Sequence, residues 1–544
     1  MSSTFTYDAI VIGAGAGGGV TAAVLSERGM RVLLLERGRR DVSLAATGRD
    51  HLRNHRLARH GHNIGPELAG NPRVFVEPNG ATRTLRPHED GWNNNAMAVG
   101  GGTSVFGAQA WRFLPDDFRM ASRYGVPSGS SLADWPITYA DLAPCYERIE
   151  WEMGVAANDA LMATHWPRAR GYPMPEMPVN SQGRAVRAGA QKMGLPVFPV
   201  PLLINTAPYN HRPACTQCSF CVGFACGVDA KNGTQNTMIP RALATGNCTL
   251  LTGARVTRIT TDVTGVVTGV TYVDDAGTMH DERSGRVIVC AGAIETARLL
   301  LLSGSAAHPH GLGNHSDQVG RNLQGHYYPG ASGLLPAPIW DGVGPGASTA
   351  TVRWNHGNAD VIGGGMLADE FIVLPIIFAK SHLPPDLPRW GAANKAFMRE
   401  GYRRYLDLKG PVQEIPSPDG RVTLDPTVRD ALGLPVARLS GTTHPETVRT
   451  AEFMRQRALQ WMVACGAVRT WSRAPVLRLS GGQHQAGTCR MGDDPATSVA
   501  DPTGRVHGHT NLYLADGSLH PTNGGFNPVL TILANALRVS EGIT

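Results

Sequence analysis

The sequence predicts an α/β protein, α+β overall, that is large enough to hold more than one structural unit. The chain of 544 residues is 42% hydrophobic and 17% charged, a globular composition with room for several cores or for one domain with a long insertion. Its N-terminal stretch, YDAIVIGAGAGGGVTAAVLSERGMRVLLLERG, reads as strand, glycine-rich turn, helix and second strand. A further strand followed by a helix is expected in VIVCAGAIETARLLLLSG. Both segments are typical of an α/β fold.

The N-terminal segment is a complete βαβ unit. Its first strand is the short apolar run AIVI, which suits a buried parallel strand. The chain then turns through Gly13, Gly15 and Gly18, which let the backbone approach a pyrophosphate at the helix N-terminus. Glu36 ends the second strand, where it can accept hydrogen bonds from a ribose. The unit therefore predicts dinucleotide binding, since a tight turn without a ligand does not explain this acid.

A second glycine cluster stands in NNNAMAVGGGTSVFGAQAWR, where three glycines precede Thr103 and Ser104. Backbone amides and hydroxyls in such a loop can contact a second part of an extended cofactor. The alternative is a glycine-rich surface loop with no ligand. The first fingerprint alone does not separate NAD from FAD.

Charge and hydropathy indicate which kinds of partner the protein binds and where it is located. The formal charge is +6, but the basic residues are dispersed and do not alternate with aromatic ones, so we expect no nucleic acid. A mildly positive surface fits an anionic cofactor. The N-terminus has no basic region before its apolar stretch, and no stretch reaches the roughly 18 apolar residues of a membrane span. These features predict a cytoplasmic protein without a membrane span.

Four of the nine cysteines cluster in CTQCSFCVGFAC, at Cys215, Cys218, Cys221 and Cys226. Thiolates at this spacing can converge on zinc or on an iron–sulfur cluster. No haem-attachment motif accompanies them, and no Pro follows the fourth cysteine. A disulfide or free thiols are the other interpretations, and we assign no metal ligand.

Four separated segments together resemble the glucose-methanol-choline (GMC) oxidoreductase family, whose members depend on FAD. Three are the βαβ unit, the VGGGTSVFG loop and VIVCAGAIETARLLLLSG, in which Ala297 stands where Pro or Ser is usual. The fourth and most specific is HQAGTCRMGDDPATSVADPTGRVHGHTNLYLADGSLHPTNGGFNPVLTILANALR. It combines a His-x-x-Gly-Thr-Cys-x-Met-Gly turn with an Asn-Pro pair that opens the last helix.

The resemblance covers about residues 5–330 and 480–544, and little is recognisable between them. Two stretches, DWPITYADLAPCYERIEWEMGV and CVGFACGVDAKNGTQNTMIPRA, are most similar to the branch that contains bacterial gluconate and related sugar dehydrogenase large subunits.

The resemblance implies a Rossmann-like FAD-binding domain interleaved with a substrate domain built on an antiparallel sheet. The FAD-binding domain is expected in three parts, at 1–130, 226–330 and 481–544, and the last part carries the catalytic residues. The substrate domain is expected in two parts, at 131–225 and 331–480.

His484 is the candidate catalytic base. Alcohol oxidation removes a proton from the O–H group and a hydride from the C–H group. In the family, flavin N5 takes the hydride and a histidine at this position faces the flavin. Histidine suits the proton step because its pKa lies near neutrality. The alternative is a core histidine bonded to the backbone.

Asn527, in NGGFNPVLT, is the second candidate catalytic residue. Its amide can donate a hydrogen bond to the substrate oxygen and stabilise a developing alkoxide. Asn before Pro can also cap the last helix, with Pro528 at its first position, and the two roles are compatible. We expect His507, His509 and His520 to be structural or surface residues.

The resemblance also implies which residues bind FAD. They are Gly13, Gly15, Gly18, Glu36, Arg37, Gly101, Gly102, Thr103, Val105, Val256, Asp516, Gly517, Asn527 and Pro528. Some relatives attach the flavin covalently through a histidine in the glycine-rich loop. Val105 stands at that position here, so we predict non-covalent FAD.

The resulting prediction is an FAD-dependent oxidoreductase that oxidises a CH–OH group of a sugar, glycoside or other polyol or alcohol. Its electrons pass to oxygen, to another acceptor or to an electron-acceptor partner subunit. Two alternatives stay open at this point: a flavin-containing lyase of the same fold, and an electron-transfer dehydrogenase subunit with an iron–sulfur cluster at Cys215–Cys226.

Overall fold

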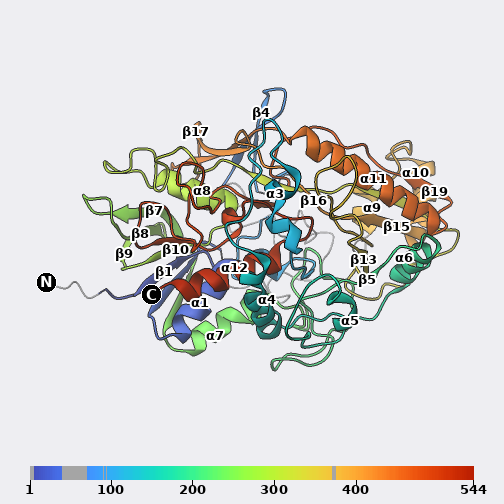
Figure 1. The fold of residues 1–544 in the computed structure, drawn as a ribbon, viewed down its shortest axis with the longest axis horizontal. Coiled ribbons are helices and arrows are strands. Elements are labelled where there is room, and N and C mark those ends of the chain that lie inside the picture. The colour runs from blue at the N-terminus through green and yellow to red at the C-terminus, as the bar shows by residue number, and fades with distance from the viewer. Residues whose placement is uncertain (1–4, 39–69, 88, 90, 93–94, 370–374) are drawn as a thin grey trace.

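The computed structural model describes residues 5–38, 70–87, 89, 91–92, 95–369 and 375–544. The molecule is elongated, and the C-terminus lies at the same end as the N-terminal βαβ unit (Figure 1). Strands β13, β15 and β19 lie toward the other end. The N-terminal and C-terminal segments of the chain are therefore neighbours in space.

A five-stranded sheet forms the core of the terminal end. Its order is β21-β10-β1-β2-β6, and every neighbouring pair is parallel. The strands are β1 (Ala9–Ile12), β2 (Val32–Glu36), β6 (Cys248–Thr252), β10 (Val287–Val289) and β21 (Leu512–Leu514). All residues of β1, β2 and β10 are buried, as expected of a parallel sheet whose two faces are both covered. The predicted α/β fold is confirmed.

Helix α1 (Ala16–Glu27) packs on this sheet more closely than any side chain allows. A Cβ at Gly17 would lie 1.7 Å from the carbonyl oxygen of Ala515, and one at Gly18 would lie 1.8 Å from that of Gly13. Helices α7 (Met238–Ala244) and α12 (Val529–Gly542) both pack against α1. Figure 1 shows the C-terminal α12 in red beside the N-terminal α1 in blue.

Two smaller sheets flank this core. The first is the antiparallel β7-β8-β9, and the second has the order β17-β18-β3-β4, with a parallel pair between β18 and β3. Their strands are β3 (Arg73–Val76), β4 (Thr82–Leu85), β7 (Arg255–Thr261), β8 (Val267–Val273), β9 (Met279–Arg283), β17 (Arg421–Arg429) and β18 (Pro435–Ser440). The β18 and β3 pair joins parts of the chain that the sequence assigns to different domains, and the domain boundaries stay a prediction.

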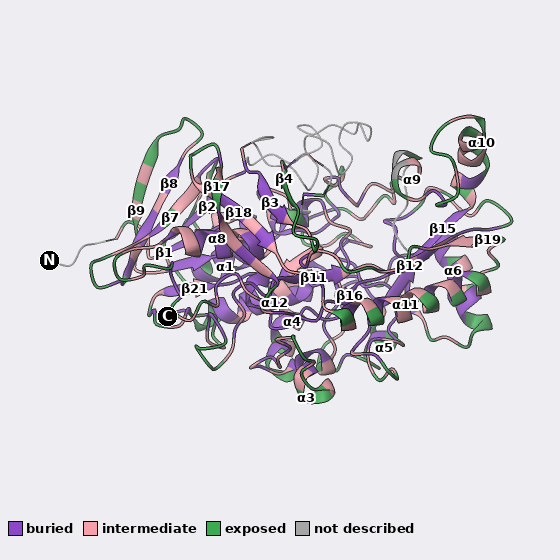
Figure 2. Cartoon of the chain, turned by 90° about the horizontal axis from the view of Figure 1, so that it is seen from above, coloured by how far each residue is buried: buried purple, intermediate pink, exposed green. Residues whose placement is uncertain are grey.

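The far end of the molecule contains the expected antiparallel sheet, with the order β19-β12-β15-β14-β13-β5. Its strands are β5 (Phe198–Pro199), β12 (Gly330–Leu334), β13 (Thr349–Thr351), β14 (Leu367–Asp369), β15 (Tyr405–Lys409) and β19 (Arg469–Trp471). Helices α11 (Pro445–Ala464) and α6 (Ser181–Lys192) pack on this sheet and on each other. Figure 2 shows α11 with buried and exposed residues alternating along it, as expected of an amphipathic helix.

A three-stranded sheet, β16-β11-β20, lies between the two ends. It consists of β11 (Gln324–Tyr327), β16 (Val412–Gln413) and β20 (Gln483–Ala486). The remaining helices are α3 (Met120–Tyr124), α4 (Tyr139–Met153), α5 (Asp159–Met162), α8 (Ala293–Leu302), α9 (Pro375–Ser381) and α10 (Ala392–Gly401). Among the helices that the structure describes, none combines the length and the apolar character needed to cross a lipid bilayer.

Helix α4 is anchored by a buried ion pair. Glu150 accepts two hydrogen bonds from the guanidinium of Arg112, at 2.8 and 2.7 Å, and one from Arg168 at 3.2 Å. Arg112 also donates to the hydroxyl of Tyr139 at 3.0 Å. The side chains of Arg112 and Glu150 are buried, so each charge depends on the other for solvation.

Replacing Glu150 by Gln is expected to lower the free energy of unfolding by about 3 kcal/mol, because it leaves a buried guanidinium without its counter-charge. Thermal melting of the holoenzyme measures the effect as a fall in Tm. Asp8→Asn is the matched control, since the Asp8–Arg31 pair is exposed, and it should shift Tm far less. Equal shifts in the two variants would show that the buried pair does not anchor α4.

Candidate active site

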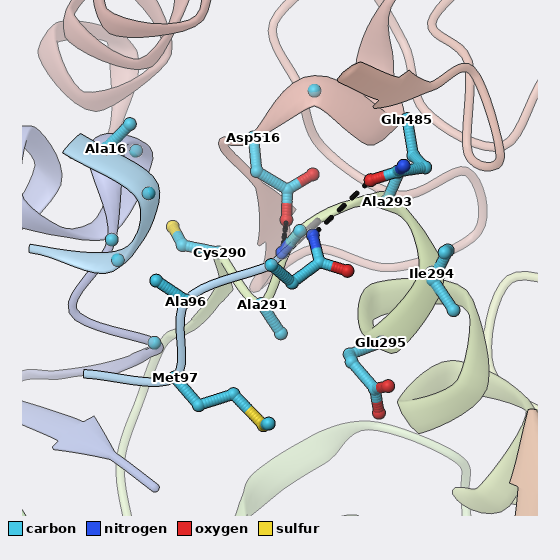
Figure 3. A pocket seen from close by; sticks show the side chains of 18 of the residues that line it. Ala16, Ala96, Met97, Cys290, Ala291, Ala293, Ile294, Glu295, Gln485 and Asp516 are labelled. Atoms are coloured by element: carbon cyan, nitrogen blue, oxygen red, sulfur yellow. Dashed lines mark hydrogen bonds between the residues drawn. The ribbon is translucent and has the colours of Figure 1, made fainter. Parts of the chain in front are cut away.

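A cavity of about 550 Å³ lies at the carboxyl ends of the parallel strands. Glu36 at the end of β2, Cys290 after β10 and Asp516 after β21 all line it. The edge where parallel strands end is the usual ligand site of such sheets, and the volume is that of a small-molecule or cofactor pocket. Figure 3 shows Asp516, Gln485 and Glu295 around the cavity, contributed by segments far apart in the sequence.

Glu36 is held in place by backbone amides. One carboxylate oxygen accepts a hydrogen bond from the amide of Ala14 at 2.9 Å, and the other accepts one from Gly38 at 2.7 Å. Burial raises the pKa of Glu36, and these two backbone hydrogen bonds oppose that shift. Each oxygen accepts one bond and keeps capacity for another, so the carboxylate can still accept hydrogen bonds from a ribose.

Arginines surround Glu295 on the cavity wall. Arg73 contacts this carboxylate at 2.8 Å, Arg298 at 3.4 Å and Arg37 at 3.9 Å. Burial alone would raise the pKa of Glu295, but the three guanidinium groups lower it below its ordinary value. Of these four residues the sequence predicted only Arg37. Glu295 and Arg298 lie in VIVCAGAIETARLLLLSG, a segment that the sequence analysis singled out without assigning a role to either residue. Arg73 was missed because the sequence of β3 contains no nucleotide-binding pattern.

The two glycine turns contact each other where they line the cavity. A Cβ at Gly15 would lie 3.9 Å from the Cα of Gly101, and one at Gly101 would lie 2.9 Å from the Cα of Gly15. At Gly102 and Gly292, which also line the cavity, a Cβ would meet no atom within 4 Å. The turns therefore leave open space beside exposed backbone, which is what a pyrophosphate needs.

Asp516 joins two segments of the cavity wall through hydrogen bonds. Its carboxylate accepts hydrogen bonds from the amide of Gly292 at 2.9 Å, the hydroxyl of Thr296 at 2.6 Å and the amide of Ser518 at 2.8 Å. These bonds tie the end of β21 to the start of α8. The same loop places Gly517 on the cavity wall.

Nearly all residues predicted to bind FAD line this one cavity. They are Gly13, Gly15, Glu36, Arg37, Gly101, Gly102, Thr103, Val105, Val256, Asp516, Gly517, Asn527 and Pro528. Gly18 is the exception, because it packs against Gly13 and Cys290 instead of facing the cavity. Two polar atoms on the wall, Nε of Arg37 and Oδ1 of Asn527, are buried without a hydrogen-bond partner among the described residues. The space, the glycine turns and these unpartnered atoms fit an extended dinucleotide such as FAD.

A β-bulge presents His484 to the cavity. Gln324 pairs with Ala486 and His326 pairs with Gln483, so one residue of β11 lies opposite two of β20. His484 has φ +61°, a left-handed conformation that costs energy outside glycine and that often marks functional positions. Gly325 makes this possible, since a Cβ there would lie 2.7 Å from the carbonyl oxygen of Gln483. The bulge turns the histidine onto the cavity wall.

Two residues that the sequence analysis missed contact His484. Its Nδ1 lies 3.0 Å from Nδ1 of His326 and 3.3 Å from the hydroxyl of Tyr328. Burial lowers the pKa of His484 well below 6.5, and His326 lowers it further. Both partners lie in GHYYPG, a stretch whose sequence alone contains no catalytic signal.

Asn527 joins the same group of side chains. Its amide nitrogen donates a hydrogen bond to the hydroxyl of Tyr328 at 3.2 Å. Helix α12 begins at Val529 with Pro528 as its N-cap, and no side chain caps this helix end. The capping interpretation of Asn527, and the placement of Pro528 at the first helical position, are therefore wrong. Asn527 and His484 lie on one cavity wall and share Tyr328 as a neighbour.

The other three histidines of the C-terminal segment do not line this cavity. His520 is buried and packs against Phe113 and Trp135, and His509 packs against His308. His507 contacts the hydroxyl of Ser498 at 2.9 Å. Their surroundings suit the structural roles expected of them.

The four clustered cysteines line a separate small cavity of about 30 Å³, together with Lys231. The ammonium of Lys231 donates to the carbonyl oxygens of Phe106, Cys221 and Phe224, at 3.0, 2.6 and 2.7 Å. All nine cysteines are free thiols. Within the described ranges, no three His, Cys, Asp or Glu side chains are placed to hold a metal ion together.

Comparisons with known proteins agree with this geometry. Models of the GMC oxidoreductase family match residues 7–328 and 416–536. The 6′′′-hydroxyparomomycin C oxidase of Streptomyces lividus is 32% identical over 551 residues, which cover 99% of this chain and 91% of the relative. The fructose dehydrogenase large subunit of Gluconobacter japonicus is 28% identical, and the match covers 100% of this chain and 98% of the relative.

Among solved structures, pyridoxine 4-oxidase from Mesorbium loti has the same fold, with a TM-score of 0.66 and 19% sequence identity. The match covers 98% of this chain and 99% of that structure. The family models cover more than half of the sequence, and the first relative matches almost its whole length. The chain therefore belongs to the GMC oxidoreductase family and is an FAD-dependent oxidoreductase that acts on CH–OH groups.

Proposed function

We propose that this enzyme oxidises a hydroxyl of a sugar, glycoside or other polyol, with His484 as the base and Asn527 as the hydrogen-bond donor to the substrate oxygen. One observation carries the proposal. His484 and Asn527 lie on the wall of one cavity and are linked through the hydroxyl of Tyr328. The names of three relatives support a sugar or glycoside: a 6′′′-hydroxyparomomycin C oxidase, a paromamine 6′-oxidase and a fructose dehydrogenase large subunit.

The side chains supply the proton step. Bound FAD supplies the hydride acceptor. Because burial keeps the imidazole of His484 neutral near pH 7, one of its nitrogens can take the proton from the substrate hydroxyl. Asn527 orients that hydroxyl and stabilises negative charge on its oxygen as the proton leaves.

The predicted FAD-binding residues take their roles from their places on the wall. We assign the pyrophosphate to the turns of Gly15, Gly101 and Gly102, and the ribose of the adenosine to Glu36. Val256, also on the cavity wall, would hold the adenine through its backbone. We expect the cofactor to be held without a covalent link, since Val105, on the wall, offers no nucleophile at the position where some relatives have a histidine.

Oxygen, another small acceptor or an electron-acceptor subunit receives the electrons. We place the enzyme in the cytoplasm.

The proposal is tested by anaerobic absorbance titration of the holoenzyme with sugars, glycosides and simple alcohols. We expect a sugar or glycoside to bleach the flavin bands. In His484→Asn, the rate constant of flavin reduction by that substrate should fall by about 10²- to 10⁴-fold, because the base is lost. Asn tolerates the left-handed backbone at this position, so the variant should fold and retain its flavin.

His507→Ala is the matched control, since this histidine lies outside the cavity, and it should reduce its flavin at the wild-type rate. Wild-type reduction kinetics in His484→Asn would refute the base assignment. No bleaching of the wild-type flavin by any substrate would favour the lyase alternative.

The lowered pKa of His484 predicts the pH dependence. The base works only when neutral, and burial, with a smaller contribution from His326, keeps it neutral to well below pH 6.5. The rate constant of flavin reduction at saturating substrate should therefore stay level from about pH 8 to about pH 6.5 and fall only in more acidic solution. Stopped-flow absorbance measures it, with the flavin content checked at each pH. An acid limb centred at or above pH 6.5 would contradict the buried, neutral base.

Acid precipitation should release the flavin into the supernatant. The one cysteine on the cavity wall, Cys290, is a poor nucleophile because burial raises the pKa of its thiol well above 9.0. Absorbance at 450 nm in the supernatant and in the redissolved pellet measures the partition. Yellow colour retained in the pellet would show a covalent link.

A further inference from the structure

A line of hydrogen bonds runs from His484 away from the cavity. Nδ1 of His484 lies 3.0 Å from Nδ1 of His326. On the other side of the His326 ring, Nε2 lies 3.0 Å from the carbonyl oxygen of Asn523 and 2.8 Å from that of Gly524. His326 is completely buried, so no solvent competes for these contacts.

The carbonyl oxygens determine where the hydrogen of His326 lies. A carbonyl oxygen only accepts hydrogen bonds, so Nε2 of His326 must be the donor to both. Burial lowers the pKa of His326 to about 4, and the ring is neutral at physiological pH. A neutral imidazole has one N–H group. Nδ1 of His326 therefore has no hydrogen and acts as an acceptor.

The protonation of His326 determines which ring nitrogen of His484 carries its hydrogen. If Nδ1 of His484 also lacked a hydrogen, two lone pairs would face each other at 3.0 Å. The favourable arrangement has Nδ1–H of His484 donating to Nδ1 of His326. Because neutral His484 also has one N–H group, its Nε2 keeps a free lone pair. That nitrogen has the form that a base requires.

Tyr328 fits the same arrangement. Its hydroxyl oxygen lies 3.3 Å from Nδ1 of His484 and accepts a hydrogen bond from the amide nitrogen of Asn527 at 3.2 Å. The N–H of His484 therefore faces two acceptors, the nearer of which is His326.

We infer that His326 is a positioning residue, which holds His484 in the tautomer whose Nε2 accepts the proton of the substrate. The inference rests on the proposed role of His484 as the base. His326 touches neither the cavity wall nor the substrate space, so it acts only through its neighbour. It also keeps its acceptor contact when His484 becomes protonated, because Nδ1–H of His484 is present in both states.

The surrounding backbone makes the tautomer rigid. The side-chain amide nitrogen of Asn523 donates to the backbone carbonyl oxygen of His484 at 2.8 Å, while the backbone carbonyl oxygen of Asn523 accepts from Nε2 of His326. Both ends of the hydrogen-bonded line are thus attached to one residue, and neither ring can rotate without breaking a buried hydrogen bond.

Two variants of His326, whose new side chains have nearly the same shape as each other, test the inference. His326→Asn places an amide oxygen near the position of Nδ1, where it can accept from His484. The side chain introduced in His326→Leu has nearly the same shape as Asn but contains no hydrogen-bond acceptor. In the Leu variant the rate constant of flavin reduction should fall at least about 10-fold, with the substrate concentration for half-maximal rate changed less than about threefold. In the Asn variant most of the wild-type rate should remain.

¹⁵N NMR of histidine-labelled holoenzyme measures the tautomer without turnover. The His484 signals are assigned as those lost in His484→Asn. We expect Nδ1 to be protonated and Nε2 unprotonated in the wild type and in His326→Asn, and Nε2 to gain hydrogen in His326→Leu. A protonated Nε2 in the resting wild type would overturn the inference, and so would a wild-type reduction rate in His326→Leu.

The two proposals fail in different ways. If His484→Asn reduces its flavin normally, the base assignment is wrong, whatever His326 does. If His484→Asn is impaired while His326→Leu is not, the base assignment stands and the positioning role is wrong. Should His326→Leu not fold, the wild-type NMR signals still decide whether the tautomer is the inferred one.

Discussion

The close contact between α1 and the end of β21 is the constraint on which the site depends. Gly17 lies so near the carbonyl oxygen of Ala515 that no other residue fits. The contact presses the N-terminal βαβ unit against the strand that leads into Asp516. Because α12 also packs on α1, the two ends of the chain build one cavity. The cofactor turn and the residues assigned to catalysis are thereby held in a single rigid unit.

A second constraint acts where β11 meets β20. The extra residue of β20 forces His484 into a left-handed backbone, and Gly325 provides the space for it. A regular pairing would alternate side chains strictly between the two faces of the sheet. The bulge breaks that alternation, so His484 and its neighbour in β11 meet while His484 also reaches the cavity. Backbone strain is here associated with the position of the candidate base.

The sequence predicted those parts of the site that local patterns encode. The turn of Gly13 and Gly15 and the acid at Glu36 form one continuous motif, so their shared cavity follows from it. His326 and Tyr328 were not predictable, because their role depends on the register between strands more than 150 residues apart in the chain. The parallel pairing of β18 with β3 was not predictable for the same reason, because these strands are also far apart in the chain. Long-range pairing leaves no periodic signal in either strand alone.

A neutral partner for His484 has an electrostatic advantage over a carboxylate. A buried carboxylate at the same place would also fix the tautomer, but its charge would favour the imidazolium and raise the pKa of the base. His484 would then be protonated over a wider range of pH, and it could take the substrate proton only in less acidic solution. His326 accepts the same hydrogen bond without adding charge, since burial keeps its own pKa near 4. The site therefore combines a fixed tautomer with a base that stays neutral, and the backbone carbonyls of Asn523 and Gly524 stabilise that combination.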